Sequence, residues 1–184
     1  MPTGVYTHPL WLNRRVRPIL FVIGPSIAYV QLTRGKYALI ESDDAHLVWG
    51  RNWCAAPHHQ EDLFYAISRE RKTLKTNLMH CTIMGTRAGK EIDHANRNGL
   101  DNRRHGNLRR ATKSQNRVNS KRRCDNKTGF KGVTINRNKK RKFQANIQWA
   151  GKQYYLGAYE TPEEAAAVVR EKAKDLHGEF ARSG

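Results

Sequence analysis

An acidic residue and a histidine stand side by side at Asp93 and His94, and a loop of asparagine, glycine and arginine follows them. An imidazole with an ordinary pKa near neutrality can accept a proton from water. A carboxylate oxygen is a ligand that Mg²⁺ prefers. Because consecutive strand residues face opposite sides, Asp93 and His94 at a strand end can serve different atoms.

Hydrolysis of a phosphodiester needs a base for the water, a cation that absorbs charge, and a scaffold that fixes both. Mg²⁺ keeps several of its waters, so one carboxylate and one amide carbonyl from the protein can suffice. Asp93 and Asn116 can supply that pair, while His94 accepts the proton. The residue types therefore indicate a metal-dependent cut in a nucleic acid strand.

The elements that must position these residues are predicted as strand, loop, strand and helix. "EID" is predicted as a short strand, "NRNGLDNRRHGN" as a turn-rich loop and "LRRA" as a second strand that pairs back. The helix "TKSQNRVN" should begin with a capping box, with Thr112 as the cap and Gln115 at the third helical position.

The charge balance favours a polyanionic partner over neutral metabolites. The 184 residues include 34 Lys and Arg against 16 Asp and Glu, for a net charge of +18. Between Asp93 and Lys142 there are 17 Lys and Arg and only three acids. A solvated or disordered run is the plainer interpretation, but the interleaved Asn, Gly, Thr and Phe favour a folded surface that contacts phosphates.

Together these residues resemble the HNH endonucleases with the ββα-metal fold, specifically the intron- and phage-type homing endonucleases with a His-Asn-Asn motif. The similarity runs from Met79 to Asn119 through "MH", "DH", "LDNR", "NL" and "SQN". The resemblance implies that His94 is the general base, that Asp93 and Asn116 bind one divalent ion, Mg²⁺ or Mn²⁺, and that Asn107 orients the loop or the imidazole. It also implies products with 3′-hydroxyl and 5′-phosphate ends.

The loop departs from that family at "RHG", where it is one residue longer than usual. Gly106 is expected to absorb the insertion, because glycine accepts unusual dihedral angles. His105 becomes a minor rival for a polar contact. His80 is expected to pack or to make a hydrogen bond near the site.

The C-terminal region is predicted as three strands, "KGVTIN", "KFQANIQW" and "QYYLGAY", followed by a helix with Thr161 as its cap. Alternation in the second strand gives one apolar face and one amide-bearing face. The region resembles the APETALA/ethylene-response-factor type DNA-binding domain through "FKGV", "YLGAYETPEEAA" and "LHGEFA". The family's usual arginines and tryptophan on this face are replaced, so its base preference does not transfer.

Amide side chains can form paired hydrogen bonds with adenine edges in the major groove, and Lys and Arg can contact phosphates. Strand parity directs one set of side chains toward DNA: Thr134, Asn136, Gln144, Asn146, Gln148, Gln153 and Tyr155. A second, cationic set is expected on phosphates or in a minor groove: Arg122, Arg123, Lys131, Arg137, Lys139, Lys140, Arg141 and Lys142.

The predicted fold class is α+β, with a small β-rich N-terminal region, a central ββα-metal nuclease motif and a C-terminal three-stranded antiparallel sheet packed on one helix. The predicted ranges are 1–26 without assignment, 27–79 β-rich, 80–119 nuclease, 120–129 basic linker and 130–181 DNA-binding. In the β-rich region, strands are expected at "IAYVQL", "KYALI", "LFYAIS" and "TLKTNLM", and a short helix at "SDDAHLVW" with Ser42 as its cap.

The sequence thus predicts a homing-type endonuclease that hydrolyses double-stranded DNA at a recognised site. The alternatives are a non-catalytic, sequence-specific DNA-binding regulator and an RNA-binding protein. We expect a monomer with no membrane partner and no small-molecule cofactor. The three cysteines are far apart and form no Cys-x-x-Cys pair, and the apolar run near residue 20 contains two prolines, so a location inside the cell is expected.

Overall fold

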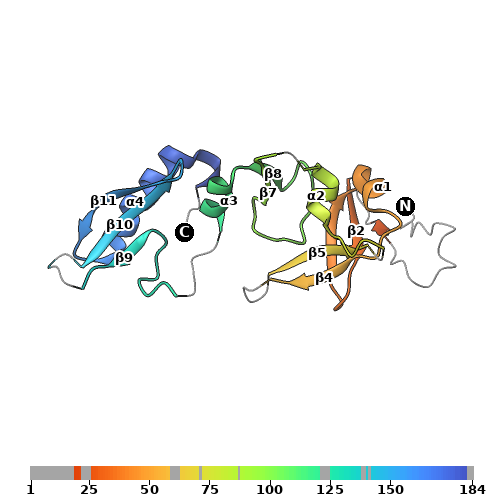
Figure 1. The fold of residues 1–184 in the computed structure, drawn as a ribbon, viewed down its shortest axis with the longest axis horizontal. Helices are drawn as coiled ribbons and strands as arrows, with labels where there is room; N and C mark the ends of the chain where they lie inside the picture. The colour runs from red at the N-terminus through yellow and green to blue at the C-terminus, as the bar shows by residue number, and fades with distance from the viewer. Residues whose placement is uncertain are drawn as a thin grey trace. The chain divides into compact units, whose positions relative to one another are not determined.

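A computed structural model describes residues 19–21, 26–58, 63–70, 72–86, 88–120, 125–137, 140 and 142–181. The chain divides into two compact units, Met1–Arg110 and Ala111–Gly184, and each is described by itself (Figure 1). Small antiparallel sheets and short helices make up both units, which confirms the α+β class. The division at residue 110 differs from the boundaries predicted at residues 79 and 119.

The first unit contains three small sheets. The first has the order β1-β2-β3, the second β4-β5-β6, and the third pairs β7 with β8. Their strands are β1 (Ile19–Phe21), β2 (Ile27–Gln31), β3 (Tyr37–Glu41), β4 (Cys54–Pro57), β5 (Phe64–Arg69), β6 (Thr76–Leu78), β7 (Glu91–His94) and β8 (Leu108–Ala111). The predicted strands at "IAYVQL", "KYALI" and "LFYAIS" are confirmed, and β4 was not predicted.

One prediction about this unit is wrong, and another is confirmed only in part. Ser42 does not cap a helix: it is the first residue of the 3-10 turn η2 (Ser42–Asp44), and its N–H donates to the Ser26 carbonyl at 3.0 Å. The short helix α1 (Ala45–Val48) follows directly. The predicted strand at "TLKTNLM" is present as the shorter β6, which ends at Leu78, and α2 (Met79–Met84) begins at the next residue. Met79 and Ile83 lie one helical turn apart and are both buried in the core, which favours a helix there.

One hydrophobic core joins the predicted β-rich region to the predicted nuclease motif. It contains Val30 and Ile40 from the first sheet, Trp53, Met79 from α2 and Leu108 from β8. The Trp53 indole N–H donates to the Val48 carbonyl at 2.9 Å, so the largest buried side chain is also hydrogen-bonded. The strands before residue 79 therefore form part of the scaffold that holds Asp93 and His94.

The second unit begins with α3 (Lys113–Asn119) and continues with a three-stranded sheet and a long helix. The predicted capping box of Thr112 with Gln115 is present, and the predicted cap Thr161 also forms a capping box, with Glu164. The elements after α3 are β9 (Val133–Ile135), β10 (Phe143–Trp149), β11 (Lys152–Tyr159), α4 (Pro162–His177) and the 3-10 turn η3 (Gly178–Phe180). The strands pair in the order β11-β10-β9.

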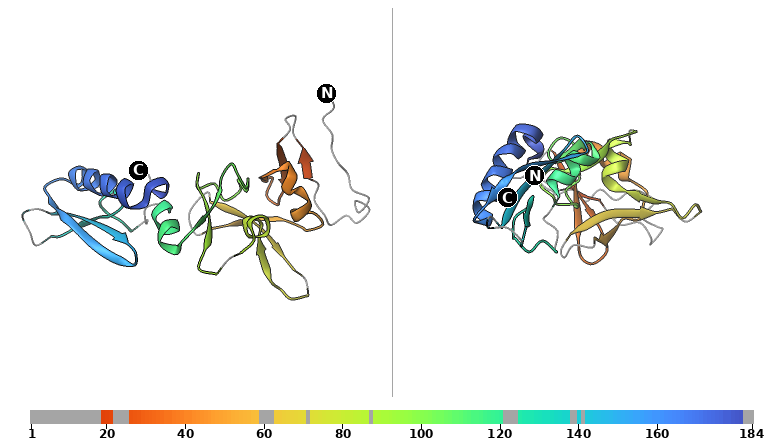
Figure 2. Two further views of the ribbon diagram at one scale, coloured as in Figure 1. Left: turned by 90° about the horizontal axis from the view of Figure 1, so that it is seen from above. Right: turned by 60° about the vertical axis from the view of Figure 1, so that its left-hand side comes forward.

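Helix α4 lies along one face of this sheet, as the two views in Figure 2 show together with Figure 1. The core between them contains Val133, Ala145, Ala165 and Val169. At the turn from β10 to β11, Ala150 and Gly151 have positive φ angles of 48° and 80°. Two left-handed residues in a two-residue turn match the twist of an antiparallel hairpin, so this turn joins two of the predicted strands directly.

Within the described ranges, no helix combines the length and apolar character needed to cross a membrane. The two cysteines in those ranges, Cys54 and Cys81, are free thiols. Burial raises the pKa of the Cys81 thiol.

Candidate active site and nucleic-acid interface

The loop between β7 and β8 is held closed by the side chain of Asn107. Its amide oxygen accepts the Asn96 N–H at 2.8 Å, and its amide nitrogen donates to the Asp101 carbonyl at 2.6 Å. The backbones of Ala95 and Asn107 also pair, at 3.0 Å. Asn107 therefore orients the loop, which is one of the two roles that the resemblance implied for it.

The same loop is docked on the first sheet and on η2. Leu39 donates to the Leu100 carbonyl at 2.8 Å, and Asn102 donates to the Leu39 carbonyl at 2.7 Å, which adds one short parallel bridge to the edge of β3. Arg104 forms a bidentate ion pair with buried Asp44, with hydrogen bonds of 2.6 to 3.1 Å. These backbone hydrogen bonds and this ion pair hold the loop against β3 and η2.

Gly99 marks a close approach between the loop and β5. A Cβ atom at this position would lie 2.4 Å from the Phe64 carbonyl oxygen and 2.6 Å from the Tyr65 ring. Such distances are far inside van der Waals contact, so only glycine fits without a shift of the loop or the strand. The approach places the loop against the Tyr65 ring.

His94 ends β7 as a buried imidazole, with 6% of the residue exposed. Its Nε2 lies 3.4 Å from the Asn102 amide oxygen. Burial lowers the pKa of His94, against the opposing effects of the Asn102 hydrogen bond and the Asp93 and Asp101 charges. With the proton on Nε2, the ring donates to Asn102 and carries its basic lone pair on Nδ1.

Two further aromatic rings surround His94. His80 from α2 packs perpendicular to it, with ring centroids 4.9 Å apart and an interplanar angle of 88°. The ring centroid of Tyr65, from β5, lies 5.7 Å from that of His94 and 5.9 Å from that of His80. Burial and the neighbouring His94 lower the pKa of His80 to about 3, and burial together with the Asp93 charge raises the pKa of Tyr65. Both His80 and Tyr65 are therefore uncharged at neutral pH.

Asp93 is 4% exposed and forms an ion pair across the hairpin with Arg109, whose Nε donates to Oδ2 at 2.8 Å. The next residue, Arg110, donates to the carbonyls of Met84 and Gly85 and so caps the C-terminal end of α2. Adjacent arginines on β8 thereby tie together β7 and the helix that bears His80.

The predicted metal ligands lie in different units. Asp93 belongs to the first unit, and Asn116 lies on α3 of the second, where its N–H donates to the Thr112 carbonyl at 2.9 Å. A carboxylate with an amide oxygen is a donor set that fits Mg²⁺ or Mn²⁺. Across the residues that the structure describes, His, Cys, Asp and Glu form no group of three that could hold a metal ion.

The expectation about Gly106 fails on geometry, and the polar contact of the His105 ring is with Glu41, whose Oε2 lies 3.8 Å from the His105 Nε2. Gly106 does not adopt a positive φ; the left-handed residue of this loop is Arg97, with φ 63°. The His105 ring is 83% exposed, and the residue is held through its backbone N–H, which donates to Glu41 at 2.9 Å. The longer loop is therefore accommodated through Arg97 and contacts with Glu41 and Asp44, and His105 presents its ring to solvent.

In the second unit, strand register places the predicted amide side chains on one face of the sheet. Gln144 pairs with Thr134, Asn146 with Tyr155, and Gln148 with Gln153. Tyr155 is 61% exposed, whereas Ala145 and Ile147 between the amides are buried. The cationic residues Arg137, Lys140 and Lys142 are exposed in the connection from β9 to β10. Arg122, Arg123, Lys139 and Arg141 lie outside the described residues.

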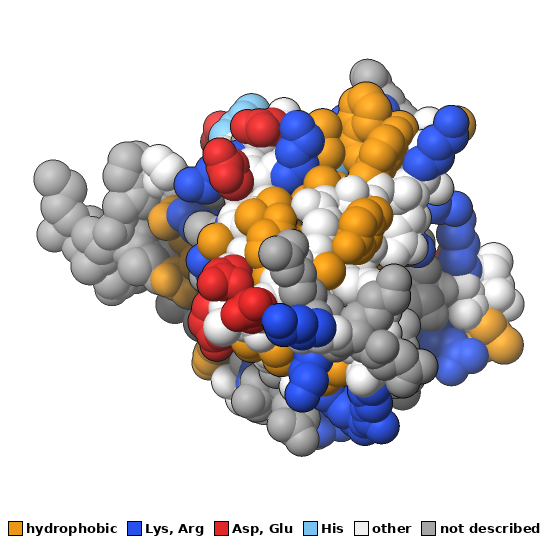
Figure 3. All heavy atoms as spheres, turned by 90° about the vertical axis from the view of Figure 1, so that its left-hand side faces the viewer, with side chains coloured by type: hydrophobic (Ala, Val, Ile, Leu, Met, Phe, Trp, Pro, Cys, Tyr) orange, Lys and Arg blue, Asp and Glu red, His pale blue; other side chains and the backbone are white. Residues whose placement is uncertain are grey.

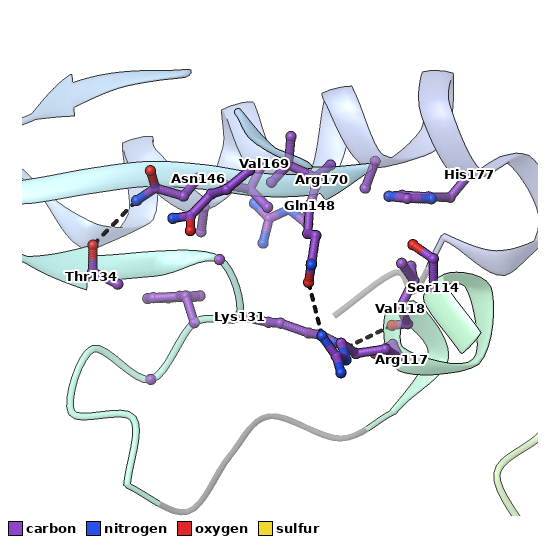
Figure 4. Close-up of a pocket in the computed structure, with 17 residues that line it drawn as sticks. Ser114, Arg117, Val118, Lys131, Thr134, Asn146, Gln148, Val169, Arg170 and His177 are labelled. Atoms are coloured by element: carbon purple, nitrogen blue, oxygen red, sulfur yellow. Dashed lines mark hydrogen bonds between the residues drawn. The ribbon is translucent and has the colours of Figure 1, made fainter. Parts of the chain in front are cut away.

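Part of the predicted face already has partners within the unit (Figure 4). The Asn146 amide donates to the Thr134 hydroxyl at 3.3 Å, and Arg117 of α3 donates to Gln148 at 3.1 Å. Lys131 donates to the carbonyls of Arg117, Val118 and Ser120 at 2.7 to 2.8 Å. Lys131 thus binds the C-terminal carbonyls of α3, and a phosphate contact for it stays a prediction.

These side chains line a pocket of about 500 Å³. His177, whose Nε2 is buried without a hydrogen-bond partner among the described atoms, also lines it. On the face of the molecule in Figure 3, Lys and Arg side chains are widely spread, and the acidic side chains gather toward the left-hand part of the view.

Comparisons with protein-family models, with curated proteins and with solved structures found no match for this chain. The local geometry therefore carries the functional argument. Sequence reasoning missed Tyr65, Asn102 and Arg109. Two of them had a signal in the sequence, because Asn102 stands inside "LDNR" and Arg109 lies on the strand opposite Asp93. Tyr65 had none, because it is distant in the chain.

Proposed function

We propose that the chain is a metal-dependent endonuclease that cuts double-stranded DNA. The observation that supports this most is His94: a buried, neutral imidazole that adjoins a buried carboxylate and is hydrogen-bonded by Asn102. A general base needs its unprotonated form at working pH and a fixed orientation. The basic composition of the loop and the amide face of the second unit support a DNA substrate.

In the proposed reaction, His94 removes a proton from a water molecule as the water oxygen bonds to phosphorus. The bond from phosphorus to the 3′ oxygen breaks, and the leaving oxygen takes a proton from a second water molecule, which gives a 3′-hydroxyl and a 5′-phosphate. Asp93 and Asn116 would hold one Mg²⁺ or Mn²⁺, which supplies charge stabilisation on the phosphate and the leaving oxygen. Asn107 keeps the loop in place, and Asn102 keeps the imidazole oriented. We further propose that the protein acts as a monomer inside the cell.

One observation favours a second candidate, a non-catalytic DNA-binding regulator. The Asp93 carboxylate already has a cationic partner, because Arg109 donates to it at 2.8 Å. A carboxylate paired in this way needs no metal to be stable when buried. The regulator would use the sheet face and the basic loop and would bind DNA without cutting it.

Incubation of the full chain with supercoiled plasmid, in Mg²⁺ and in excess chelator, tests the proposal. The nuclease should convert plasmid to nicked or linear forms only with Mg²⁺, and end mapping should give 3′-hydroxyl and 5′-phosphate termini. Specific binding without conversion in either buffer would select the regulator. Preference for RNA over duplex DNA in competition at fixed salt would contradict both.

A further inference from the structure

The imidazole of His80 has no part in the reaction proposed above, yet it touches the proposed base directly. It approaches His94 at a centroid distance of 4.9 Å with the rings at 88°. Only 7% of the residue is exposed, and its Nδ1 is buried without a hydrogen-bond partner among the atoms that the structure describes. The ring contact that the structure shows for His80 is therefore with the proposed base and not with a group of the substrate.

The contact between the rings is enclosed by three elements. His80 comes from α2, Tyr65 from β5 and His94 from the end of β7. Helix α2 cannot easily slide, because Arg110 of β8 binds its last carbonyls and Met79 is fully buried in the core. Perpendicular packing of aromatic rings is a preferred and directional arrangement. The position of α2 therefore determines the orientation of the His94 ring.

We propose that His80 is a positioning residue, whose uncharged ring fixes the orientation of His94 for proton removal in the nuclease reaction. This inference rests on the proposed function. We assign this role to the ring because the ring lies in direct contact with His94, while the buried Nδ1 has no hydrogen-bond partner among the described atoms. The low pKa of His80, about 3, is consistent with this role because it keeps a second positive charge away when His94 accepts its proton.

Four variants of the full chain separate the effect of the His80 ring from the effect of its nitrogen atoms and from any damage to the fold. H80F keeps an uncharged ring and removes the unsatisfied nitrogen, H80Q keeps polar atoms without a ring, and H80A removes both. Y65F is the matched control, since it keeps the second ring and loses only a hydroxyl. Single-turnover cleavage and DNA binding are measured for each, together with the midpoint of thermal unfolding.

We expect H80F and Y65F to cleave within about threefold of wild type, because both keep the ring packing. H80A and H80Q should cleave about 10 to 100 times more slowly with DNA affinity unchanged, because a misplaced catalytic group costs rate and not binding. An unfolding midpoint for H80F at or above that of wild type would show that its result reports on the ring and not on a damaged fold.

Three outcomes would overturn the inference. Wild-type rates in H80A would show that His94 needs no neighbour, and a folded H80F as slow as H80A would show that a nitrogen acts instead of the ring. Equal losses of rate and DNA affinity in H80A would assign His80 to the fold alone. A wild-type chain that binds DNA but never cuts it would instead refute the proposed function, which distinguishes the two failures.

Discussion

The two units present their candidate residues in opposite ways. In the first, Asp93, His94 and Asn102 are nearly inaccessible and held by ion pairs, hydrogen bonds and ring contacts. In the second, Gln148, Gln153 and Tyr155 stand on an exposed sheet face. Burial fixes orientation and changes proton affinity, which suits chemistry, whereas exposure leaves hydrogen-bonding groups open to a groove.

The sharpest way to test this contrast is to remove the buried imidazole. His94→Ala should slow cleavage by about 10² to 10⁴, the usual contribution of a general base. DNA affinity should stay within about twofold, because phosphate contacts dominate it. Cleavage rates and dissociation constants at one salt concentration measure both effects.

His105→Ala is the matched control for this variant. The ring of His105 is 83% exposed and lies in the same loop, so its loss should leave the cleavage rate unchanged. Equal activity of His94→Ala and wild type would refute the assignment of the base.

A change on the exposed sheet face of the second unit should alter DNA recognition and leave the chemical step intact. The double variant Gln144→Ala with Gln153→Ala removes two amides of the predicted reading face, and each good amide–base pair contributes about 1–3 kcal/mol of discrimination. Preference for the cognate site should therefore fall at least tenfold, while the rate on saturating DNA stays constant.

The comparison variant for the face is Glu171→Ala with Lys172→Ala, a charge-neutral change on the exposed side of α4. It should alter neither preference nor rate. If the Gln144→Ala, Gln153→Ala variant prefers the cognate site over random DNA as strongly as the Glu171→Ala, Lys172→Ala variant does, the sheet face is not the reader. Substitutions are preferable to removal of residues 130–184, because that truncation would cut through the compact unit Ala111–Gly184.

The contrast also explains which features could be predicted from the sequence. In the second unit, alternation in "KFQANIQW", the turn at Ala150 and the capping box at Thr161 act between neighbours in the chain, and each appears in the structure. Strand parity then places Gln144, Asn146 and Gln148 on one face without further information.

The surroundings of His94 depend on contacts that no local pattern encodes. Arg104 binds Asp44 across 60 residues, and Tyr65 reaches His94 from another sheet. The range 27–79 carried no recognisable chemistry in the sequence, yet its β3, η2 and β5 hold the loop. The "MH" at Met79 is part of the resemblance, but the helix that starts there depends on the burial of Met79 and Ile83 in the same core.

The close approach at Gly99 offers a test of that long-range docking. Gly99→Ala should destabilise the first unit by about 1–3 kcal/mol, the usual cost of overpacking, because the new methyl group would overlap the Phe64 carbonyl and the Tyr65 ring. Cleavage should slow as well, because the loop carries Asn102. Chemical denaturation and single-turnover rates measure the two effects.

Gly89→Ala is the control for Gly99→Ala, because it adds a methyl group where the backbone conformation is unfavourable but no atom lies in the way. Gly89 has φ +71° and no atom within 4 Å of an added Cβ, so its substitution should cost only about 1 kcal/mol of left-handed strain. A loss of cleavage in Gly89→Ala equal to that in Gly99→Ala would remove the special role of the docking contact.

Acid should weaken the first unit through its buried imidazoles. The pKa of His80 is about 3 in the folded chain and near 6.5 when unfolded, so unfolding takes up a proton between these values. The stabilisation is complete above pH 6.5 and is lost as the pH falls toward 3. Between pH 7.5 and pH 5, the free energy of unfolding should fall by about 2 kcal/mol from His80 alone.

His80→Phe should flatten this pH dependence, because it removes the buried imidazole whose pKa is lowered to about 3. Denaturation curves at several pH values measure the slope. An unchanged slope in His80→Phe would contradict the buried, neutral state of that ring.

The smallest expected effect concerns Lys131, which lies in the second unit but is not open like the neighbouring face. Its ammonium binds the last carbonyls of α3, so Lys131→Met should destabilise α3 by about 1 kcal/mol, the usual scale for a cation at a helix C-terminus. Amide hydrogen exchange of residues 113–119 in the full chain would report this. Lys152→Met, an exposed lysine at the start of β11, should leave that exchange unchanged.

The same variant decides between anchoring and phosphate contact. A lysine on a phosphate would lower the slope of log affinity against log salt by about one when removed, whereas an anchoring lysine would change the exchange of α3 and leave the salt slope intact. A changed salt slope with unchanged exchange would transfer Lys131 to the DNA-binding surface, as the sequence predicted. Because its ammonium already has three carbonyl partners at 2.7 to 2.8 Å, we expect Lys131→Met to change the amide exchange of α3 and to leave the salt slope unchanged.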